Sequence, residues 1–174
     1  MLIKPIFNSV IMMGLLSIFG INLAGASSTG YYSVPAAEFM DASGNACNTY
    51  NYGNQIQVSN VTGCTLLAGV HLPDGVTVTK MTMYWYDSNT EDDILGAFEG
   101  STFAGWASSL AYLYSDQAVA ASSSSVNTSI LIDNANNEYY LRAIIPANQS
   151  SSGLGLIGFR LDYTNQTFIS LINR

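Results

Sequence analysis

The stretch Val76–Tyr86, VTVTKMTMYWY, is the clearest β-strand in the sequence and decides the fold class. Its side chains alternate with a period of two, so successive residues point to opposite faces of a sheet. One predicted face holds Thr77, Thr79, Met81, Met83 and Trp85. The other holds Val76, Val78, Lys80, Thr82, Tyr84 and Tyr86. We expect the face with the methionines and Trp85 to lie in the core.

Shorter stretches of the same kind recur along the chain, separated by turn signals such as Pro73-Asp74-Gly75. The further strands expected are Gln55–Ser59, Thr65–Leu72, Ile94–Thr102, Trp106–Ser115, Thr128–Ile132, Glu138–Ile145, Leu154–Tyr163 and Phe168–Ile172. The Ser-rich segment Ala120–Asn127 is expected to be a loop or frayed edge, and Pro35–Met40 a turn of helix or an irregular strand. About eight strands without an internal repeat predict an all-β fold, a single jelly-roll-like antiparallel β-sandwich.

Three segments resemble a group of secreted bacterial proteins that look like jelly-roll-type β-sandwiches and have no established activity. They are VHLPDGVTVTKMTMYWYDSNTEDDI (Val70–Ile94), IDNANNEYYLRAII (Ile132–Ile145) and LGLIGFRLDY (Leu154–Tyr163). The resemblance consists of strand and turn patterns over about Ser33–Tyr163. It implies the fold and assigns no site residues.

Residues 1–26 have the layout of a secretory signal peptide. One positive charge, Lys4, precedes an apolar stretch that ends in Ala24-Gly25-Ala26, with small residues at −3 and −1 of a cut before Ser27. The sequence therefore predicts a signal peptide over 1–26 and a β-sandwich domain over 27–174. We expect the protein to be secreted or held at the cell surface, or to reside in the periplasm, with no membrane segment after cleavage.

The charge balance excludes two classes of partner. The chain has 12 acidic and 5 basic residues, a formal net charge of −7, and only 10% of its residues are charged. A nucleic-acid binder needs a basic face to neutralise phosphates, and docking on anionic lipid needs the same. Neither nucleic acid nor an anionic membrane surface is expected as a partner.

The two cysteines, Cys47 and Cys64, are predicted to form a disulfide, because an exported protein folds in an oxidising compartment. Catalytic motifs are missing. His71 is the only histidine and stands beside Pro and Asp rather than a nucleophile motif, and no G-x-S-x-G segment occurs. The chain is therefore not expected to be an enzyme.

An acidic loop, Asp87–Asp93, follows the central strand and is expected to be exposed. Two readings of it stay open. Asp87, Asn89, Glu91 and Asp93 offer oxygen ligands of the kind that calcium prefers, although the twelve-residue calcium-loop pattern is incomplete. Alternatively the loop is a solvated turn between strands. No cofactor other than calcium is expected.

Tyrosines suggest a ligand-binding surface. Tyr84 and Tyr86 share one strand face, and Tyr112 and Tyr114 share another. Exposed aromatic rings stack on the C–H faces of sugars, whereas buried ones stabilise the sheet through cross-strand pairs. Both readings stay open for these four residues.

The first functional interpretation is a non-catalytic structural component of an extracellular surface, matrix or appendage. Low charge density favours packing against further copies or other surface proteins, because fewer ions are desolvated at each contact. The alternative is a carbohydrate-binding module with a polysaccharide partner, and a small secreted hydrolase is the third interpretation.

Overall fold

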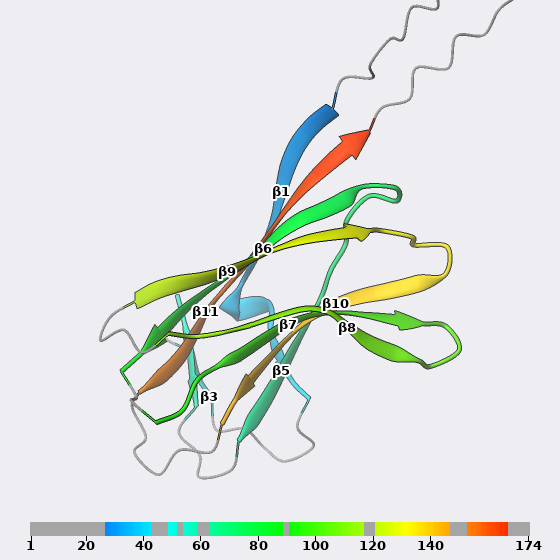
Figure 1. Ribbon diagram of the computed structural model, residues 1–174. Coiled ribbons are helices and arrows are strands. Elements are labelled where there is room, and N and C mark those ends of the chain that lie inside the picture. The colour runs from blue at the N-terminus through cyan, green and yellow to red at the C-terminus, as the bar shows by residue number, and fades with distance from the viewer. Residues whose placement is uncertain are drawn as a thin grey trace, which may run out of the picture.

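The computed structural model describes residues 27–42, 49–51, 54–58, 63–88, 91–116, 121–146 and 153–166. These residues form a β-sandwich of two antiparallel sheets (Figure 1), as predicted. The elements are β1 (Ser27–Pro35), the 3-10 turn η1 (Ala36–Glu38), β2 (Met40–Asp41), β3 (Thr49–Asn51), β4 (Ile56–Val58), β5 (Cys64–Gly69), β6 (Thr77–Asp87), β7 (Leu95–Thr102), β8 (Ala107–Tyr114), β9 (Ala121–Leu131), β10 (Asn137–Ile145) and β11 (Leu154–Gln166). A helix of membrane-spanning length and hydrophobicity does not occur within these ranges.

The chain passes back and forth between the two sheets. The first sheet, sheet A, has the order β3-β4-β11-β6-β9, and β1 also pairs with β11. The second sheet, sheet B, has the order β2-β5-β10-β7-β8. The strands β8 and β9 are consecutive in the sequence, yet each ends a different sheet, and the two contact each other across the gap between the sheets.

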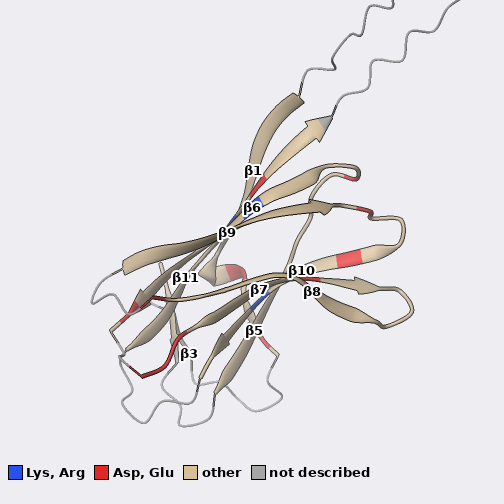
Figure 2. Cartoon of the chain, in the orientation of Figure 1, with Lys and Arg blue, Asp and Glu red and all other residues tan. Residues whose placement is uncertain are grey.

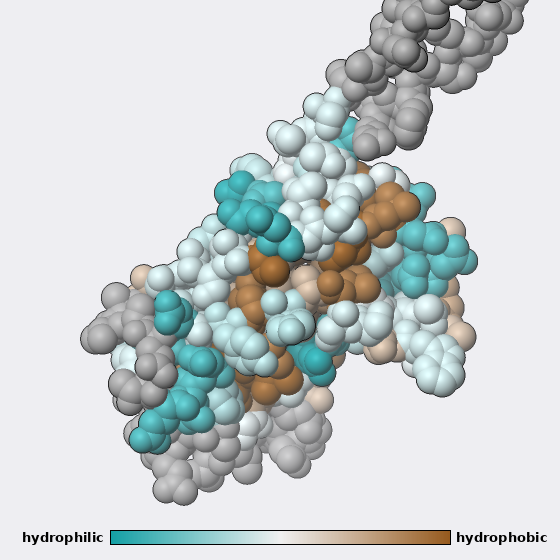
Figure 3. Space-filling model, viewed as in Figure 1, coloured by the Kyte–Doolittle hydropathy of each residue, from teal (hydrophilic) through white to brown (hydrophobic). Residues whose placement is uncertain are grey.

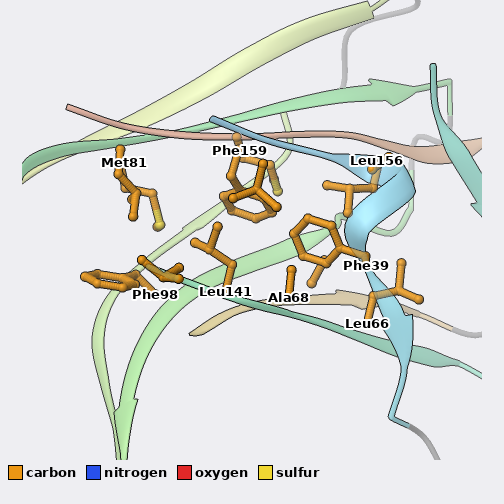
Figure 4. Packing of buried hydrophobic residues seen from close by; sticks show 14 of the residues in the cluster. Phe39, Leu66, Ala68, Met81, Phe98, Leu141, Leu156 and Phe159 are labelled. Atoms are coloured by element: carbon orange, nitrogen blue, oxygen red, sulfur yellow. The ribbon is translucent and has the colours of Figure 1, made fainter. Parts of the chain in front are cut away.

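The core lies between the sheets and is closely packed (Figure 4). Met81, Met83 and Trp85 of β6 are fully buried, which confirms the core face predicted for this part of the strand. They meet Phe98 of β7 from the facing sheet, and Phe159 of β11 lies beside them in sheet A. The indole Nε1 of Trp85 donates a hydrogen bond of 3.1 Å to Ser124 Oγ, a polar partner of the kind a buried tryptophan requires.

The start of β6 departs from the predicted alternation. Val76 and Val78 are buried, whereas Thr77 and Thr79 are half-buried, so the face assignment is wrong before Lys80. The reason is an irregularity in the pairing with β11, where Lys80 and Val78 pair with the consecutive residues Asp162 and Tyr163, so that Thr79 is an extra residue in β6. One extra residue in a strand reverses the face of every residue before it.

The Ser-rich segment was expected to be a loop or a frayed edge, and the loop is wrong, because the segment lies in an edge strand of sheet A. It forms most of β9, which pairs with β6 over its length. Small polar side chains are exposed on one face, and Ser124, Val126, Thr128 and Ile130 are half-buried on the other. The expected turn within Pro35–Met40 is confirmed by η1, and the expected strand Phe168–Ile172 lies outside the described residues.

Candidate functional site

The outer face of sheet B carries three rows of side chains fixed by the strand register. Tyr140, Glu99 and Ser109 lie side by side on β10, β7 and β8. The next row holds Arg142, Ala97 and Tyr112, and the third holds Ile144, Leu95 and Tyr114. We call this surface the tyrosine face. It changes from polar to apolar along the strands, which is an amphipathic arrangement.

Tyr112 and Tyr114 are the exposed aromatic residues of this face. Their exposed fractions are 62% and 53%, and their ring centroids lie 6.3 Å apart with an angle of 80° between the planes. They are two residues apart on β8, so both point away from the core, where Leu113 is buried between them. Because the planes are nearly perpendicular, a ligand that stacks on one ring contacts the edge of the other.

A charged cluster lies next to the tyrosines. Glu99 is only 5% exposed, and its Oε1 receives a salt bridge of 2.5 Å from Arg142 Nη2. Ser109 Oγ donates a hydrogen bond of 3.0 Å to the same oxygen. The side chain of Arg142 is 33% exposed, although its guanidinium Nε is buried and has no hydrogen-bond partner among the described residues. The Glu99–Arg142 pair therefore places a hydrogen-bond donor and an acceptor beside the tyrosine rings, and the two charges cancel.

Tyr140 completes the cluster from β10. Burial raises the pKa of Tyr140, and the hydrogen bond to the Glu99 carboxylate raises that pKa further. The hydroxyl therefore stays protonated at neutral pH and is a donor beside the carboxylate. The cluster as a whole is a fixed set of hydrogen-bonding groups rather than a free acid or base.

A groove opens at the edge of the tyrosine face. A cavity of about 480 Å³ lies between β8 and β9, lined by Ser109, Leu110, Ala111, Tyr112, Val126, Asn127 and Thr128. Its volume is within the range of small-molecule sites. Tyr112 thus borders both the groove and the open face.

The other two predicted tyrosines lie elsewhere. Tyr84 is 36% exposed and Tyr86 is half-buried, and both point outward from sheet A, on the opposite side of the sandwich. The same outer face carries Arg160, which forms a salt bridge of 2.6 Å with Asp162 and lies 4.7 Å from the ring centre of Tyr31. The four tyrosines therefore form two separate pairs.

The sequence predicts an exposed acidic loop, and this prediction is wrong for its first residue, Asp87. Asp87 is fully buried, and Ser115 Oγ donates a hydrogen bond of 2.5 Å to its Oδ2, while Glu91 and Asp93 are exposed. The error arose because Asp87 still belongs to β6. Asn89 lies outside the described residues, and no group of three metal-ligating side chains is found within them. Both readings of the loop, a calcium site and a solvated turn, therefore stay open.

The predicted disulfide also stays a prediction. Cys64 is buried at the start of β5, and Cys47 lies outside the described residues, as does the predicted signal peptide, 1–26. The carboxylates that a hydrolase could use in pairs are, from the sequence, Glu99, Asp116, Glu138 and Asp162. Of these, Glu99 and Asp162 project from opposite outer faces of the sandwich and pair with different arginines. They do not face each other across a cleft.

Sequence reasoning missed Arg142 and Tyr140. The alternation of Glu138, Tyr140, Arg142 and Ile144 along β10 was a visible signal that these side chains share a face. The register that sets Arg142 beside Glu99 of β7 could not be read from that alternation.

Known proteins match this chain in structure and not in sequence. Neither a protein-family model nor a curated protein matches it, so the resemblance to the secreted bacterial group stays a prediction. The C-terminal CBM6 module of LamC, a marine laminarinase of Zobellia galactanivorans, has a TM-score of 0.50 at 13% identity, over 76% of this chain and 98% of that module. The xylan-binding module CBM15 has a TM-score of 0.47 at 9% identity, over 81% of this chain and 100% of that module.

A family 35 carbohydrate-binding module from Clostridium thermocellum has a TM-score of 0.45 at 14% identity, over 76% of this chain and 97% of that module. The structural neighbours named here are thus carbohydrate-binding modules with a β-sandwich fold. At this identity, the match to the LamC module shows that the two chains share a fold, and it assigns no ligand.

Proposed function

We propose that this chain is an exported, non-catalytic carbohydrate-binding protein whose tyrosine face binds a neutral polysaccharide. The observation that carries the proposal is the position of Tyr112 and Tyr114, both more than half exposed, in the row that holds Arg142 of the ion pair and in the row after it. Rings and hydrogen-bonding groups therefore occur together on one rigid sheet.

Sugars have the complementary chemistry. A pyranose ring presents C–H groups on its faces and hydroxyls around its rim. The C–H groups would stack on Tyr112 and Tyr114, and the hydroxyls would bond the Arg142 guanidinium and the polar side chains of the first row. Because β7, β8 and β10 hold all these groups in fixed register, little side-chain entropy is lost on binding.

Charge favours a neutral ligand over an acidic one. The charges of Glu99 and Arg142 cancel within the tyrosine face. The chain as a whole carries a formal charge of −7, which repels a polyuronate or a sulfated polysaccharide at a distance. A neutral glucan or xylan-type chain encounters no such repulsion.

Binding, rather than hydrolysis, suits the state of the carboxylates. A glycosidase needs a free acid and a free base or nucleophile on either side of the scissile bond. Glu99 is instead held by Arg142, Ser109 and Tyr140. Such a carboxylate can still accept a hydrogen bond from a sugar hydroxyl.

Affinity electrophoresis in gels that contain soluble polysaccharides tests the proposal. We expect neutral glucans or xylans to retard the protein and polyuronates to leave its mobility unchanged. Tyr112→Ala and Tyr114→Ala should each weaken binding by about 10-fold, roughly 1.4 kcal/mol. Tyr84→Ala, which removes an exposed ring from the opposite face, is the matched control and should bind like the parent. Equal mobility on every polysaccharide would contradict the proposal.

A further inference from the structure

Two long strands end their sheets on the same side of the sandwich. The strand β9 (Ala121–Leu131) ends sheet A next to β6, and β8 (Ala107–Tyr114) ends sheet B next to β7. Among the described strands, none pairs with the outer side of either. An unpaired strand edge presents backbone N–H and C=O groups that another strand can bind.

The composition of β9 lacks the usual protection of such an edge. Over its 11 residues, ASSSSVNTSIL, it contains no Lys, Arg, Asp, Glu or Pro. Figure 2 shows no charged residue along its length. Edge strands of monomeric proteins are commonly short, or carry charges and prolines that prevent pairing. A long, uncharged edge strand is typical of an edge that is covered.

The gap beside β9 is apolar. Figure 3 shows a hydrophobic band between β9 and β8, where Leu110, Val126 and Ile130 are only half-buried. Cavities of about 480 Å³ and 220 Å³ share Leu110, and the second is also lined by Trp106 and Leu131, which are 78% and 62% exposed. An apolar surface of this kind marks an interaction site.

We propose that two copies of this chain pair antiparallel through β9 and form a dimer with one continuous sheet. A strand paired antiparallel with itself is self-complementary about a twofold axis. Full overlap of Ala121–Leu131 sets this axis at Val126 and places Ser123 of each copy opposite Ser129 of the other.

The twofold axis also explains the apolar gap. Residues opposite each other in an antiparallel pair point to the same face, so both copies keep their core on the same side of the joined sheet. The β8 edge of each copy then faces that of the other, and the dimer covers Leu110, Val126 and Ile130 of both copies.

The charge distribution favours a second copy of this chain as the partner of the β9 edge. Two chains of formal charge −7 repel each other, and β9 is a surface where they can approach without adding like charges at the contact. This inference does not depend on the proposed sugar binding.

The test is sedimentation velocity of the chain from Ser27 to Arg174, with charge pairs introduced at the expected register. Ser123→Lys/Ser129→Lys places like charges directly opposite each other twice, and Ser123→Lys/Ser129→Glu places opposite charges there. Both serines are exposed; Ser123 lies opposite Tyr84 on β6, and Ser129 is two residues from Asn127, the partner of Lys80, so the melting temperature of each variant reports any effect of the new charge on Lys80 within one chain. Ser28→Lys/Thr29→Lys on β1 adds the same charge to exposed positions elsewhere in sheet A and is the control.

We expect the parent and the control to sediment as dimers. The like-charge variant should raise the dimer dissociation constant on the order of tenfold, and the opposite-charge variant should restore or lower it. All variants should keep the parent melting temperature within a few degrees, which separates lost pairing from lost folding. A monomeric parent, or a like-charge variant that dimerises as tightly as the opposite-charge one, overturns the proposal.

Discussion

The ion pair between Glu99 and Arg142 is expected to stabilise the fold as well as to shape the tyrosine face. Two unit charges 4 Å apart attract by about 4 kcal/mol at an effective dielectric constant of 20. The side chain of Arg142 is 33% exposed, so water screens part of this attraction. We therefore expect a coupling free energy of about 1–2 kcal/mol, in the lower part of or below the range of about 1.5–3 kcal/mol for hydrogen bonds to charged groups.

A double-mutant cycle measures this coupling. Urea unfolding of the parent, Glu99→Gln, Arg142→Gln and the double variant gives the four free energies of unfolding. The two single variants should differ. Arg142→Gln leaves the 5% exposed carboxylate of Glu99 without its cation, whereas Glu99→Gln leaves an arginine that can turn toward water. Arg142→Gln should therefore cost more. A coupling below about 0.3 kcal/mol, the level of independent sites, would refute the reasoning.

Four further outcomes are expected. Trp85→Ala should lower the free energy of unfolding by about 3–5 kcal/mol in urea, because the ring is fully buried. Gly158→Ala should cost about 1–3 kcal/mol in the same assay, since Gly158 has φ 153° and an added Cβ would lie 2.6 Å from the Val34 carbonyl oxygen. The pKa of Tyr140 is raised, so the native state keeps a proton that the unfolded chain loses above about pH 10. Stability is thus complete below that pH and falls as pH rises further, and Tyr140→Phe should flatten this decline. Melting curves in EDTA, CaCl₂ and matched MgCl₂ should coincide, because the buried Asp87 carboxylate already accepts a hydrogen bond from Ser115. A melting-temperature increase specific to calcium would instead reveal a calcium site.

The sequence was informative where a strand alternates strictly. The end of β6 from Met81 to Tyr86 follows the predicted faces, because a half-buried strand selects apolar residues at every second position. The first residues of β6 do not, since the extra residue Thr79 in the pairing with β11 leaves no mark in composition. The strand β9 was missed for a related reason. Serine is a weak strand former, and only pairing with β6 holds this segment extended.

The candidate site could be predicted only in part. The shared face of Tyr112 and Tyr114 follows from their spacing on one strand, whereas their exposure, which the sequence left open, depends on the position of β8 at the edge of sheet B. Their separation from Tyr84 and Tyr86 depends on which sheet each strand joins, and local sequence does not encode that assignment. The approach of Glu99 and Arg142 depends on the register of β7 against β10, which is set by long-range pairing.

The most direct test of the central claim locates the bound sugar on the protein. Backbone amide chemical shifts of the ¹⁵N-labelled chain from Ser27 to Arg174 would be followed during titration with a neutral glucan or xylan oligosaccharide. The account predicts that the largest shifts fall on β7, β8 and β10 around Glu99, Tyr112, Tyr114 and Arg142, and that Tyr112→Ala/Tyr114→Ala abolishes them. Shifts centred on Tyr84 and Arg160 of sheet A, or no shifts with any neutral oligosaccharide, would contradict it.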